Sequence, residues 1–270
     1  MGAVLTKDDV VRVDLGQEPE RAYIHLFADW HVGDRFCDIE RIKNDVDILK
    51  KSKDHYAICV GDLMNNAIKS SVSNIYSEKI SPQEQIDRII EILAPVKDRI
   101  LYMTAGNHES RTFKEAGLDP MAVVAAKLDL SDRYSKNGGV LSFSIGRDRT
   151  NTPRNSTRRI KYYFYILHGT GGGSKPGAKI NRLVDLASIV DADIYIHAHT
   201  HLPMATMIPF CRINRSHDVV TMEDRLFVNA ASKLKYGGYG KEKGMTPSSM
   251  ADPIIFIDGK KRGFGCSLCN

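Results

Sequence analysis

Short apolar runs alternate with helical patterns through the first part of the chain. Residues 22–28 (AYIHLFA) and 56–60 (YAICV) are apolar runs of strand length, which predict buried strands. Between them, residues 38–53 place apolar side chains three and four positions apart with charged residues opposite, as an amphipathic helix does. A strand, a helix and a second strand in this order predict a βαβ unit, whose strands are parallel neighbours joined by a right-handed crossover.

Further helices and strands follow from the same patterns. Ser81-Pro-Gln-Glu84 is a capping box with proline at the first helical position, so a helix is predicted from residue 81 to about residue 98. Residues 65–80 before it are polar and weakly periodic, and we expect them to form a surface excursion. Strands are predicted at 100–104, 140–145, 162–167, 194–196, 203–213, 226–230 and 254–257, and helices from 119 to about 128 and from 178 to about 190.

The composition is that of an ordinary soluble globular protein, with 42% hydrophobic and 26% charged residues. A length of 270 residues predicts one large domain, with a core over about residues 22–258, a loop at 146–159 and a short, frayed C-terminal tail at 259–270. No apolar run reaches the length of a signal peptide or a membrane span, which favours a cytoplasmic protein without a membrane partner. The five cysteines are irregularly spaced, as expected for reduced thiols.

The chain carries a formal net charge of +5, which favours an anionic partner such as a phosphate ester, DNA or RNA. A solvated basic face would give the same value. Five arginines lie in the 146–159 loop, and among them Arg154 and Arg158 are candidates for contacts with phosphate. A mobile, solvated loop explains these arginines equally well. The sequence leaves the oligomeric state open.

Two glycine-rich stretches add weaker candidates for substrate binding. Residues 169–177 (GTGGGSKPG) lack the ending of a Walker loop, but their backbone amides and Lys175 could approach an anion. Tyr236-Gly-Gly-Tyr-Gly240 could present Tyr236 to a base or nucleoside. A flexible turn is the slightly favoured explanation of the first stretch and an equal explanation of the second.

Histidines and carboxylates follow the predicted strands at the points where the strands end. His197, His199 and His201 alternate after the 194–196 strand, and a buried imidazole needs a partner for each ring nitrogen. Five strand ends would bring such groups to one edge, which predicts a metal site. Taken singly, Asp29 or Asp62 is explained as well by a helix cap or a turn. The earlier strands end at Asp29-Trp30-His31, Gly61-Asp62, Gly106-Asn107-His108-Glu109 and His168.

In this order the motifs resemble those of the calcineurin-like metallophosphoesterases, over about residues 22–230. The family pattern is Asp-x-His, Gly-Asp-x-x-Asp, Gly-Asn-His-Asp/Glu, a lone His and Gly-His-x-His, and the chain has a counterpart of each block. The resemblance implies an α/β fold, a four-layer α/β/β/α sandwich of two mixed sheets flanked by helices. It also implies a metal-dependent hydrolase of phosphoric esters.

The resemblance assigns the site residues as well. Asp62 would bridge two divalent metal ions, and His108 would stay free of metal, either to stabilise the transition state or to donate a proton. Oxygen and imidazole ligands without thiolate are expected to hold Mn²⁺, with Fe, Zn or Ni as alternatives. The ligands implied for one ion are Asp29, His31, Asp62 and His201, and those implied for the other are Asp62, Asn107, His168 and His199.

Three positions depart from the family pattern. Asn65 stands where an aspartate usually orients the catalytic imidazole, and an amide oxygen accepts a hydrogen bond but cannot stabilise an imidazolium by charge. We therefore expect the protonated form of His108 to be less favoured here. Ala198 replaces a glycine, which is a small change. His197 has no place in the pattern, and a hydrogen bond that supports a ligand or a core position explains it better than metal binding.

These features favour a phosphodiesterase or nuclease that hydrolyses nucleic acid or nucleotide diesters. The net charge, the arginines of the 146–159 loop and Asn65 all favour that choice. A phosphomonoesterase acting on proteins or nucleotides is the alternative. A non-catalytic binding module that contains metal is a third possibility, against which the spare imidazole of His108 argues. Residues 61–78, Ser81-Pro-Gln-Glu84 and the Tyr236 stretch also resemble phosphoesterases encoded by phages and prophages.

Overall fold

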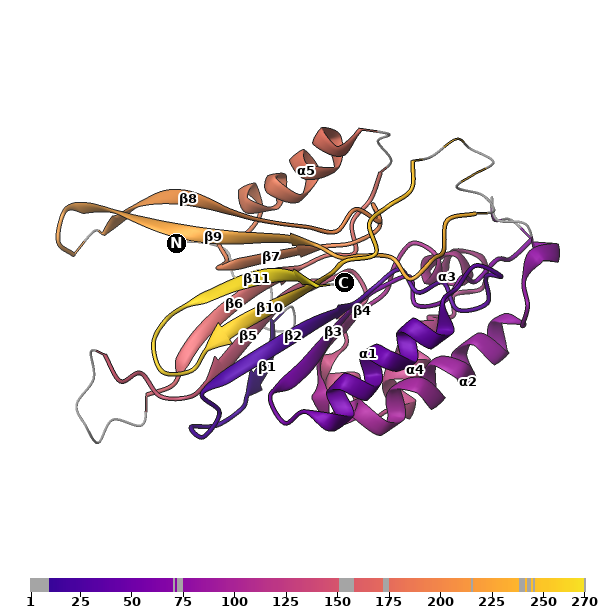
Figure 1. Ribbon diagram of the computed structural model, residues 1–270, viewed down its shortest axis with the longest axis horizontal. Helices are drawn as coiled ribbons and strands as arrows, with labels where there is room; N and C mark the ends of the chain where they lie inside the picture. Colours follow the sequence, from indigo (N-terminus) through magenta and orange to yellow (C-terminus); the bar gives the residue numbers. More distant parts are fainter. Residues whose placement is uncertain are drawn as a thin grey trace.

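Figure 1 shows the computed structural model, which describes residues 10–69, 71, 75–150, 158–171, 175–214, 216–237, 241, 244 and 246–269. The strands are β1 (Val10–Asp14), β2 (Arg21–Phe27), β3 (His55–Val60), β4 (Ile100–Thr104), β5 (Gly139–Ile145), β6 (Ile160–Ile166), β7 (Ile194–His197), β8 (Met204–Asn214), β9 (Val219–Asn229), β10 (Asp252–Asp258) and β11 (Phe264–Cys269). The α-helices are α1 (Ile39–Lys51), α2 (Pro82–Leu93), α3 (Glu109–Ala116), α4 (Pro120–Lys127) and α5 (Pro176–Val184). Short 3₁₀ helices cover Ile75–Ser77, Ala94–Arg99, Ser131–Arg133 and Asp185–Ser188.

Two mixed sheets lie at the centre of the fold. The five-stranded sheet has the order β11-β10-β2-β3-β4, and the six-stranded sheet has the order β1-β5-β6-β7-β9-β8. The strands β2, β3 and β4 are parallel, as the βαβ pattern predicts, whereas β10 is antiparallel to β2. Alternate residues of β2, including Ile24 and Leu26, lie in the apolar core between the two sheets. Phe164 of β6 and Val228 of β9 belong to the same core.

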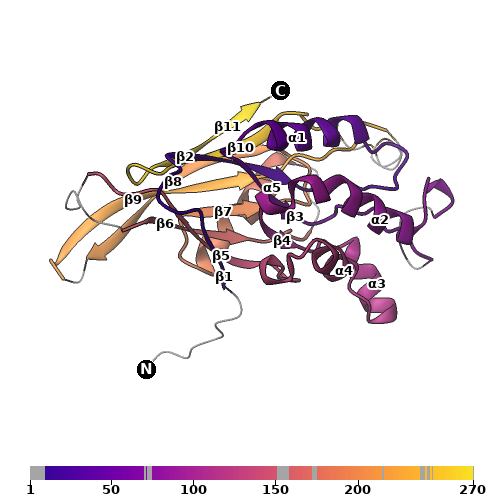
Figure 2. The same ribbon diagram turned by 90° about the horizontal axis from the view of Figure 1, so that it is seen from below.

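Helices cover the outer face of each sheet. Ile42 of α1, Ile89 of α2 and Val124 of α4 pack in one apolar cluster with side chains of β2, β3 and β4. On the other sheet, Leu183 of α5 packs with Phe227 of β9. This arrangement confirms the expected α/β sandwich of two mixed sheets flanked by helices. In Figures 1 and 2 the β8–β9 hairpin extends away from the helices on the five-stranded sheet.

Local sequence explains where α2 begins and ends. The Ser81 side chain accepts a hydrogen bond from the Glu84 amide, and the Glu84 side chain accepts one from the Ser81 amide, which confirms the capping box. The α-helix ends at Leu93, and Ala94–Arg99 continue as a 3₁₀ helix. The expected helix to residue 98 is therefore too long, because Pro95 lacks the N–H that an α-helical bond requires.

Of two expectations about irregular segments, the one about the C-terminal residues is wrong. The C-terminal residues, expected as a frayed tail, form β11, which pairs antiparallel with β10 from Phe264 to Cys269. The segment that begins at Asn65 is buried at Asn65 and Asn66, whereas Lys69, Tyr76 and Lys79 further along it are exposed, as expected for a surface excursion. Within the described residues, no helix combines the length and the apolar character that crossing a membrane requires.

A buried ion network joins the five-stranded sheet to α1 near the site. The Lys233 side chain is only 1% exposed, and its Nζ contacts the carboxylates of Asp252, at 2.7 Å, and Asp45. Asp252 also pairs with Arg41 of α1 at 2.6 Å. The backbone amide of Lys233 donates to the carbonyl of Asp29, so the network holds the chain against the loop that follows β2.

We predict that Lys233→Met lowers the free energy of unfolding by about 3–5 kcal/mol, because two carboxylates lose their buried cation. Urea unfolding at neutral pH measures this. Lys50→Met is the matched control, since Lys50 forms an exposed pair with Asp47 on α1, and its loss is expected to stay within about 0.5 kcal/mol. Equal losses for the two variants would contradict the stabilising role of the network.

Candidate metal centre

The predicted metal ligands follow the carboxyl ends of five strands. Asp29 and His31 follow β2, Asp62 follows β3, and Asn107 follows β4. His168 follows β6, and both His199 and His201 follow β7. The structure brings these side chains, apart from Asn107 and with the addition of His108, into three overlapping groups whose potential ligand atoms lie within 4.8 Å of one another. The groups are Asp29, His31 and His201; His31, Asp62 and His108; and Asp62, His168 and His199.

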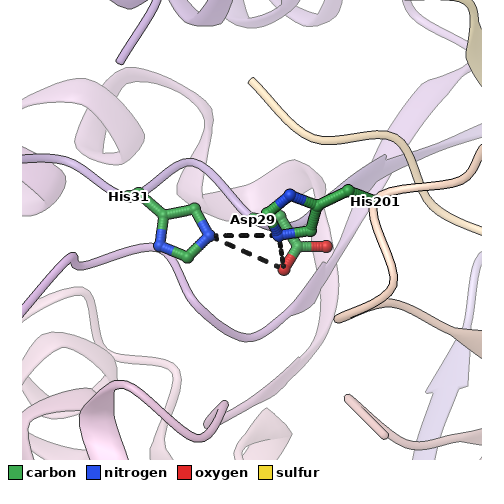
Figure 3. Close-up of side chains that lie close together, drawn as sticks. All are labelled: Asp29, His31 and His201. Atoms are coloured by element: carbon green, nitrogen blue, oxygen red, sulfur yellow. Dashed lines mark hydrogen bonds and ion pairs between the residues drawn. The ribbon is translucent and has the colours of Figure 1, made fainter. Parts of the chain in front are cut away.

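The first group surrounds the buried carboxylate of Asp29 (Figure 3). His201 Nε2 lies 3.3 Å from Asp29 Oδ1, and His31 Nε2 lies 3.9 Å from the same oxygen. The two ring nitrogens are 3.3 Å apart. Asp29 Oδ2 accepts a hydrogen bond from the His199 amide at 3.0 Å, whereas Oδ1 accepts none from the described residues. A cation between these three atoms would satisfy the unpaired oxygen and both imidazoles.

The third group surrounds Asp62. His168 Nε2 lies 3.2 Å from Asp62 Oδ2 and 3.1 Å from Asn107 Oδ1. His168 Nδ1 lies 2.6 Å from the carbonyl oxygen of Val60, which can only accept, so Nδ1 carries a proton and Nε2 is the nitrogen available to a metal. Together with His199, these side chains converge on one point and could hold a metal ion.

Asp62 belongs to groups on both sides, which is the position expected for a bridging carboxylate. The donors are carboxylate and amide oxygens with imidazole nitrogens, and the groups contain no thiolate. Such donors suit divalent ions of intermediate hardness. The residues present therefore fit a divalent metal centre.

Several of the candidate ligands have a strained backbone. Non-glycine residues avoid the left-handed region, because the Cβ atom meets the carbonyl oxygen there. Strain of this kind occurs at functional sites when the surrounding structure imposes it. The candidate ligands with a left-handed φ, between 49° and 61°, are Asp29, His31, Asp62, His199 and His201.

Two glycines allow the loops after β3 and β4 to approach each other closely. A Cβ atom on Gly106 would lie 2.1 Å from Asp62 Oδ1, and one on Gly61 would lie 2.6 Å from the Gly106 amide nitrogen. Contacts this short exclude any side chain at either position. The glycines of Gly61-Asp62 and Gly106-Asn107 therefore let the two loops place their ligands side by side.

Glu109 fixes both of these loops, a role that the sequence analysis did not assign. Its buried carboxylate accepts hydrogen bonds from the backbone amides of Asp62 at 3.0 Å, Met64 at 3.0 Å and Gly106 at 2.8 Å. Burial and the neighbouring Asp62 carboxylate raise the pKa of Glu109 to about 7, against the effect of the amide donors. Its position directly after Gly-Asn-His was the signal in the sequence, but the partners became apparent only in three dimensions.

Burial and neighbouring charges set the protonation of the other side chains. Burial lowers the pKa of His31 and of His199, so both imidazoles are neutral and can bind metal at neutral pH. Burial opposes protonation of His168, but the Asp62 carboxylate outweighs it and raises the pKa of His168 to about 10. Burial would raise the pKa of Asp62, yet His168 and His108 hold it well below its usual range.

His108 lies beside the centre, and its Nε2 is 3.7 Å from Asp62 Oδ2. Its Nδ1 lies 2.6 Å from the backbone carbonyl oxygen of Asn65. The Asn65 side chain instead donates to Glu78. The amide oxygen of Asn65 was expected to take the place of the missing aspartate, but the main chain of the same residue orients the imidazole. Burial lowers the pKa of His108 and outweighs the Asp62 carboxylate, which raises it, and the charge of Arg111 adds to the lowering. The protonated form of His108 is therefore disfavoured, as expected from the sequence.

His197, at the end of β7, is buried and is not a member of the three groups. Its Nδ1 lies 3.0 Å from Asn229 Oδ1, and the Asn229 amide donates to Thr200 Oγ1 at 2.9 Å and to the Leu202 carbonyl at 2.6 Å. His197 therefore helps to hold the loop that carries His199 and His201.

Three of the four predicted substrate-binding residues are among those that the structure describes. Lys175, Arg158 and Tyr236 are exposed, and none is a member of those groups. Arg154 lies outside the described residues. Lys179 of α5, in contrast, donates to the Thr200 carbonyl at 2.7 Å, between His199 and His201.

A sequence profile of the calcineurin-like phosphoesterases matches residues 22–203 of the chain. No curated protein sequence matches the chain at a significant level. Among solved structures, Vacuolar Protein Sorting 29 from Cryptosporidium parvum is 13% identical, with a TM-score of 0.41 and coverage of 93% of this chain and 98% of that chain. A predicted phosphoesterase from Streptococcus pneumoniae is 13% identical, with a TM-score of 0.37 and coverage of 92% and 98%. The nuclease MPE from Pseudomonas putida is 12% identical, with a TM-score of 0.34 and coverage of 90% and 87%. Likenesses at these TM-scores carry no argument about activity.

We predict that Glu109→Gln weakens Mn²⁺ binding about 10-fold to 100-fold. The reason is that the backbone amides of Asp62, Met64 and Gly106, which Glu109 holds in place, lose a charged acceptor. Calorimetric titration with Mn²⁺ measures the affinity. The matched control is Glu115→Gln, which changes an exposed residue of the same helix, α3. If Glu109→Gln binds Mn²⁺ as tightly as the control does, the carboxylate does not support the centre.

Proposed function

The chain belongs to the calcineurin-like phosphoesterase family, and from this premise we propose that it is a binuclear metal-dependent hydrolase of phosphate esters. The observation that carries the proposal is the arrangement around Asp62. Two of the three groups share this carboxylate, and one of them contains His108, which in our proposal stays free of metal beside it. A purely structural metal site has no use for such an imidazole.

In this proposal each metal ion has its own ligands and shares Asp62. We expect Mn²⁺ in both positions, with Fe, Zn or Ni as alternatives. When bound, the two ions supply an activated water and draw negative charge from the phosphoryl oxygens. Asp29, His31, Asp62 and His201 would hold one ion, and Asp62, Asn107, His168 and His199 would hold the other.

His108 is the residue that we expect to act on the substrate directly. The Asn65 carbonyl fixes Nδ1, so Nε2 is the ring nitrogen that faces the centre. Because Nδ1 keeps its proton on the Asn65 carbonyl, Nε2 carries a proton only when the ring is doubly protonated, and in that form it can donate a hydrogen bond or that proton to the oxygen that leaves phosphorus. The Asn65 carbonyl is a neutral acceptor and orients the ring without adding negative charge.

We propose that the substrate is a phosphodiester, in nucleic acid or in a nucleotide. The net charge of +5 and the arginines of the 146–159 loop support an anionic polymer. A phosphomonoesterase is the alternative. The stretches around Gly61 and Tyr236, which resemble phosphoesterases of phages and prophages, add the proposal of a phage or prophage origin.

Hydrolysis of model esters in the presence of Mn²⁺ tests the reaction and the substrate class together. We expect faster turnover of bis-p-nitrophenyl phosphate, a diester, than of p-nitrophenyl phosphate, a monoester. Faster turnover of the monoester would support the phosphomonoesterase instead. Absence of turnover on both esters would leave a binding module as the better description.

Two substitutions separate catalysis from metal binding. His108→Ala is expected to keep its Mn²⁺ and to lose turnover by about 10²-fold or more, because it removes the acid but no ligand. Asp62→Asn is expected to lose Mn²⁺ and activity together. Metal analysis of the dialysed proteins and initial rates on the diester measure both effects. Full activity of His108→Ala on the diester would contradict the mechanism.

For DNA binding, we predict that affinity falls steeply as salt rises, with a slope of log K against log salt of about −0.9 for each phosphate contact. Lys175→Ala and Arg158→Ala should each reduce the magnitude of that slope by about one contact. Lys51→Ala, at the exposed end of α1, is the control. Fluorescence anisotropy with a labelled duplex measures the slopes, and an affinity that is independent of salt would contradict the phosphate contacts.

A further inference from the structure

Arg111 places a guanidinium directly beside His108. It lies on the first turn of α3, three residues after His108, and its Nη2 is 3.0 Å from His108 Nε2. Its Nη1 donates to the backbone carbonyl of Asn65 at 3.2 Å and to that of Asn66 at 3.5 Å. The guanidinium is half-buried and is therefore held in a defined place at the side of the metal centre.

The hydrogen bonds of His108 show which way the contact with Arg111 runs. Nδ1 faces a carbonyl oxygen, which only accepts, so Nδ1 donates. A guanidinium has donors and no acceptor, so Nε2 accepts from Arg111 with its lone pair. Arg111 thus occupies the ring nitrogen that would face a substrate. A group that acts through Nε2 requires Arg111 to move to another acceptor.

The charge around the centre indicates what that acceptor is. Two divalent ions would bring four positive charges, of which the carboxylates of Asp29 and Asp62 neutralise two and that of Glu109, when ionised, a third. Arg111 adds another positive charge at the same place, next to His108. An anion bound between the ions and the guanidinium offsets this excess, and the planar donors of arginine match the oxygens of a phosphate.

The neighbouring loop has further hydrogen bonds besides those from Arg111. The Asn66 side-chain amide donates to the His108 carbonyl at 2.6 Å and to Thr112 Oγ1 at 2.9 Å. The Asn66 backbone amide donates to Gln85 Oε1 at 2.8 Å. Since these bonds already anchor the loop, structural support alone is a poor explanation of a cationic side chain here.

We propose that Arg111 is a substrate-binding residue, whose guanidinium leaves His108 Nε2 and donates its N–H groups to the phosphoryl oxygens of the bound ester. This inference rests on the proposed function. It adds a cation supplied by the chain itself to the metal centre. The same movement frees Nε2 of His108, so substrate binding and exposure of the acting nitrogen are one event.

Binding of inorganic phosphate to the Mn²⁺-loaded protein tests the proposal without turnover. Arg111→Gln is expected to weaken phosphate binding about 10-fold to 100-fold in a calorimetric titration, with unchanged Mn²⁺ content and unchanged thermal unfolding midpoint. Arg111→Lys keeps the charge without the planar donors and should lose less. Arg88→Gln, which removes an exposed guanidinium paired with Glu91 on α2, is the control and should bind as the wild type does.

The kinetic counterpart is a fall in kcat/KM on the diester of about 10²-fold for Arg111→Gln. Guanidinium chloride at millimolar concentration should restore part of the phosphate binding of Arg111→Ala, which a structural role would not produce.

Phosphate binding by Arg111→Gln equal to that of the control would overturn the proposal, as would a loss of Mn²⁺ or of thermal stability that accounts for the weaker binding. A wild type without turnover would refute the proposed function, whereas the phosphate titrations would still decide the role of Arg111.

Discussion

The structure depends on two buried carboxylates that face imidazoles. Asp29 and Asp62 are almost completely buried, and a carboxylate without water is stable only beside positive charge or hydrogen-bond donors. The His199 amide supplies a donor to Asp29, and the His108 amide supplies one to Asp62 at 2.8 Å. The remaining oxygens face ring nitrogens, so a cation completes the arrangement. The left-handed backbone of the ligands after β2, β3 and β7 is the conformational cost of placing them around these carboxylates.

The parts of the fold that could be predicted from sequence are those in which the signal is local. The capping box of α2 depends on residues within a few positions of one another, and so do the strands and the helix of the βαβ unit. Each ligand motif is likewise a short local pattern. Parallel strands bring their ends to one edge of a sheet, so convergence of the ligands within each sheet followed from topology, whereas the meeting of β2, β3 and β4 with β6 and β7 of the other sheet did not. Pro95 is also a local signal, and it predicts the end of α2 before residue 95, where the expected helix was too long.

The parts that could not be predicted depend on contacts between distant residues. The strand β1 pairs with β5, with Val10 opposite Val140, and β11 gains its order only by pairing with β10. Glu109 was visible as a member of a motif, but its three amide partners come from two loops. The strained φ angles have no signature in the sequence either, because Asp and His occur in turns of many kinds.

The replacement of an aspartate by Asn65 changes the electrostatics of His108 more than its orientation. The backbone carbonyl of Asn65 holds Nδ1, so the ring position does not depend on the side chain at this residue. A carbonyl lacks the charge that would stabilise an imidazolium, and burial together with Arg111 disfavours that charge further. A site with a neutral imidazole still needs positive charge near the leaving oxygen. Arg111 lies on the same turn of helix and carries that charge without depending on protonation, which accounts for an aspartate being dispensable here.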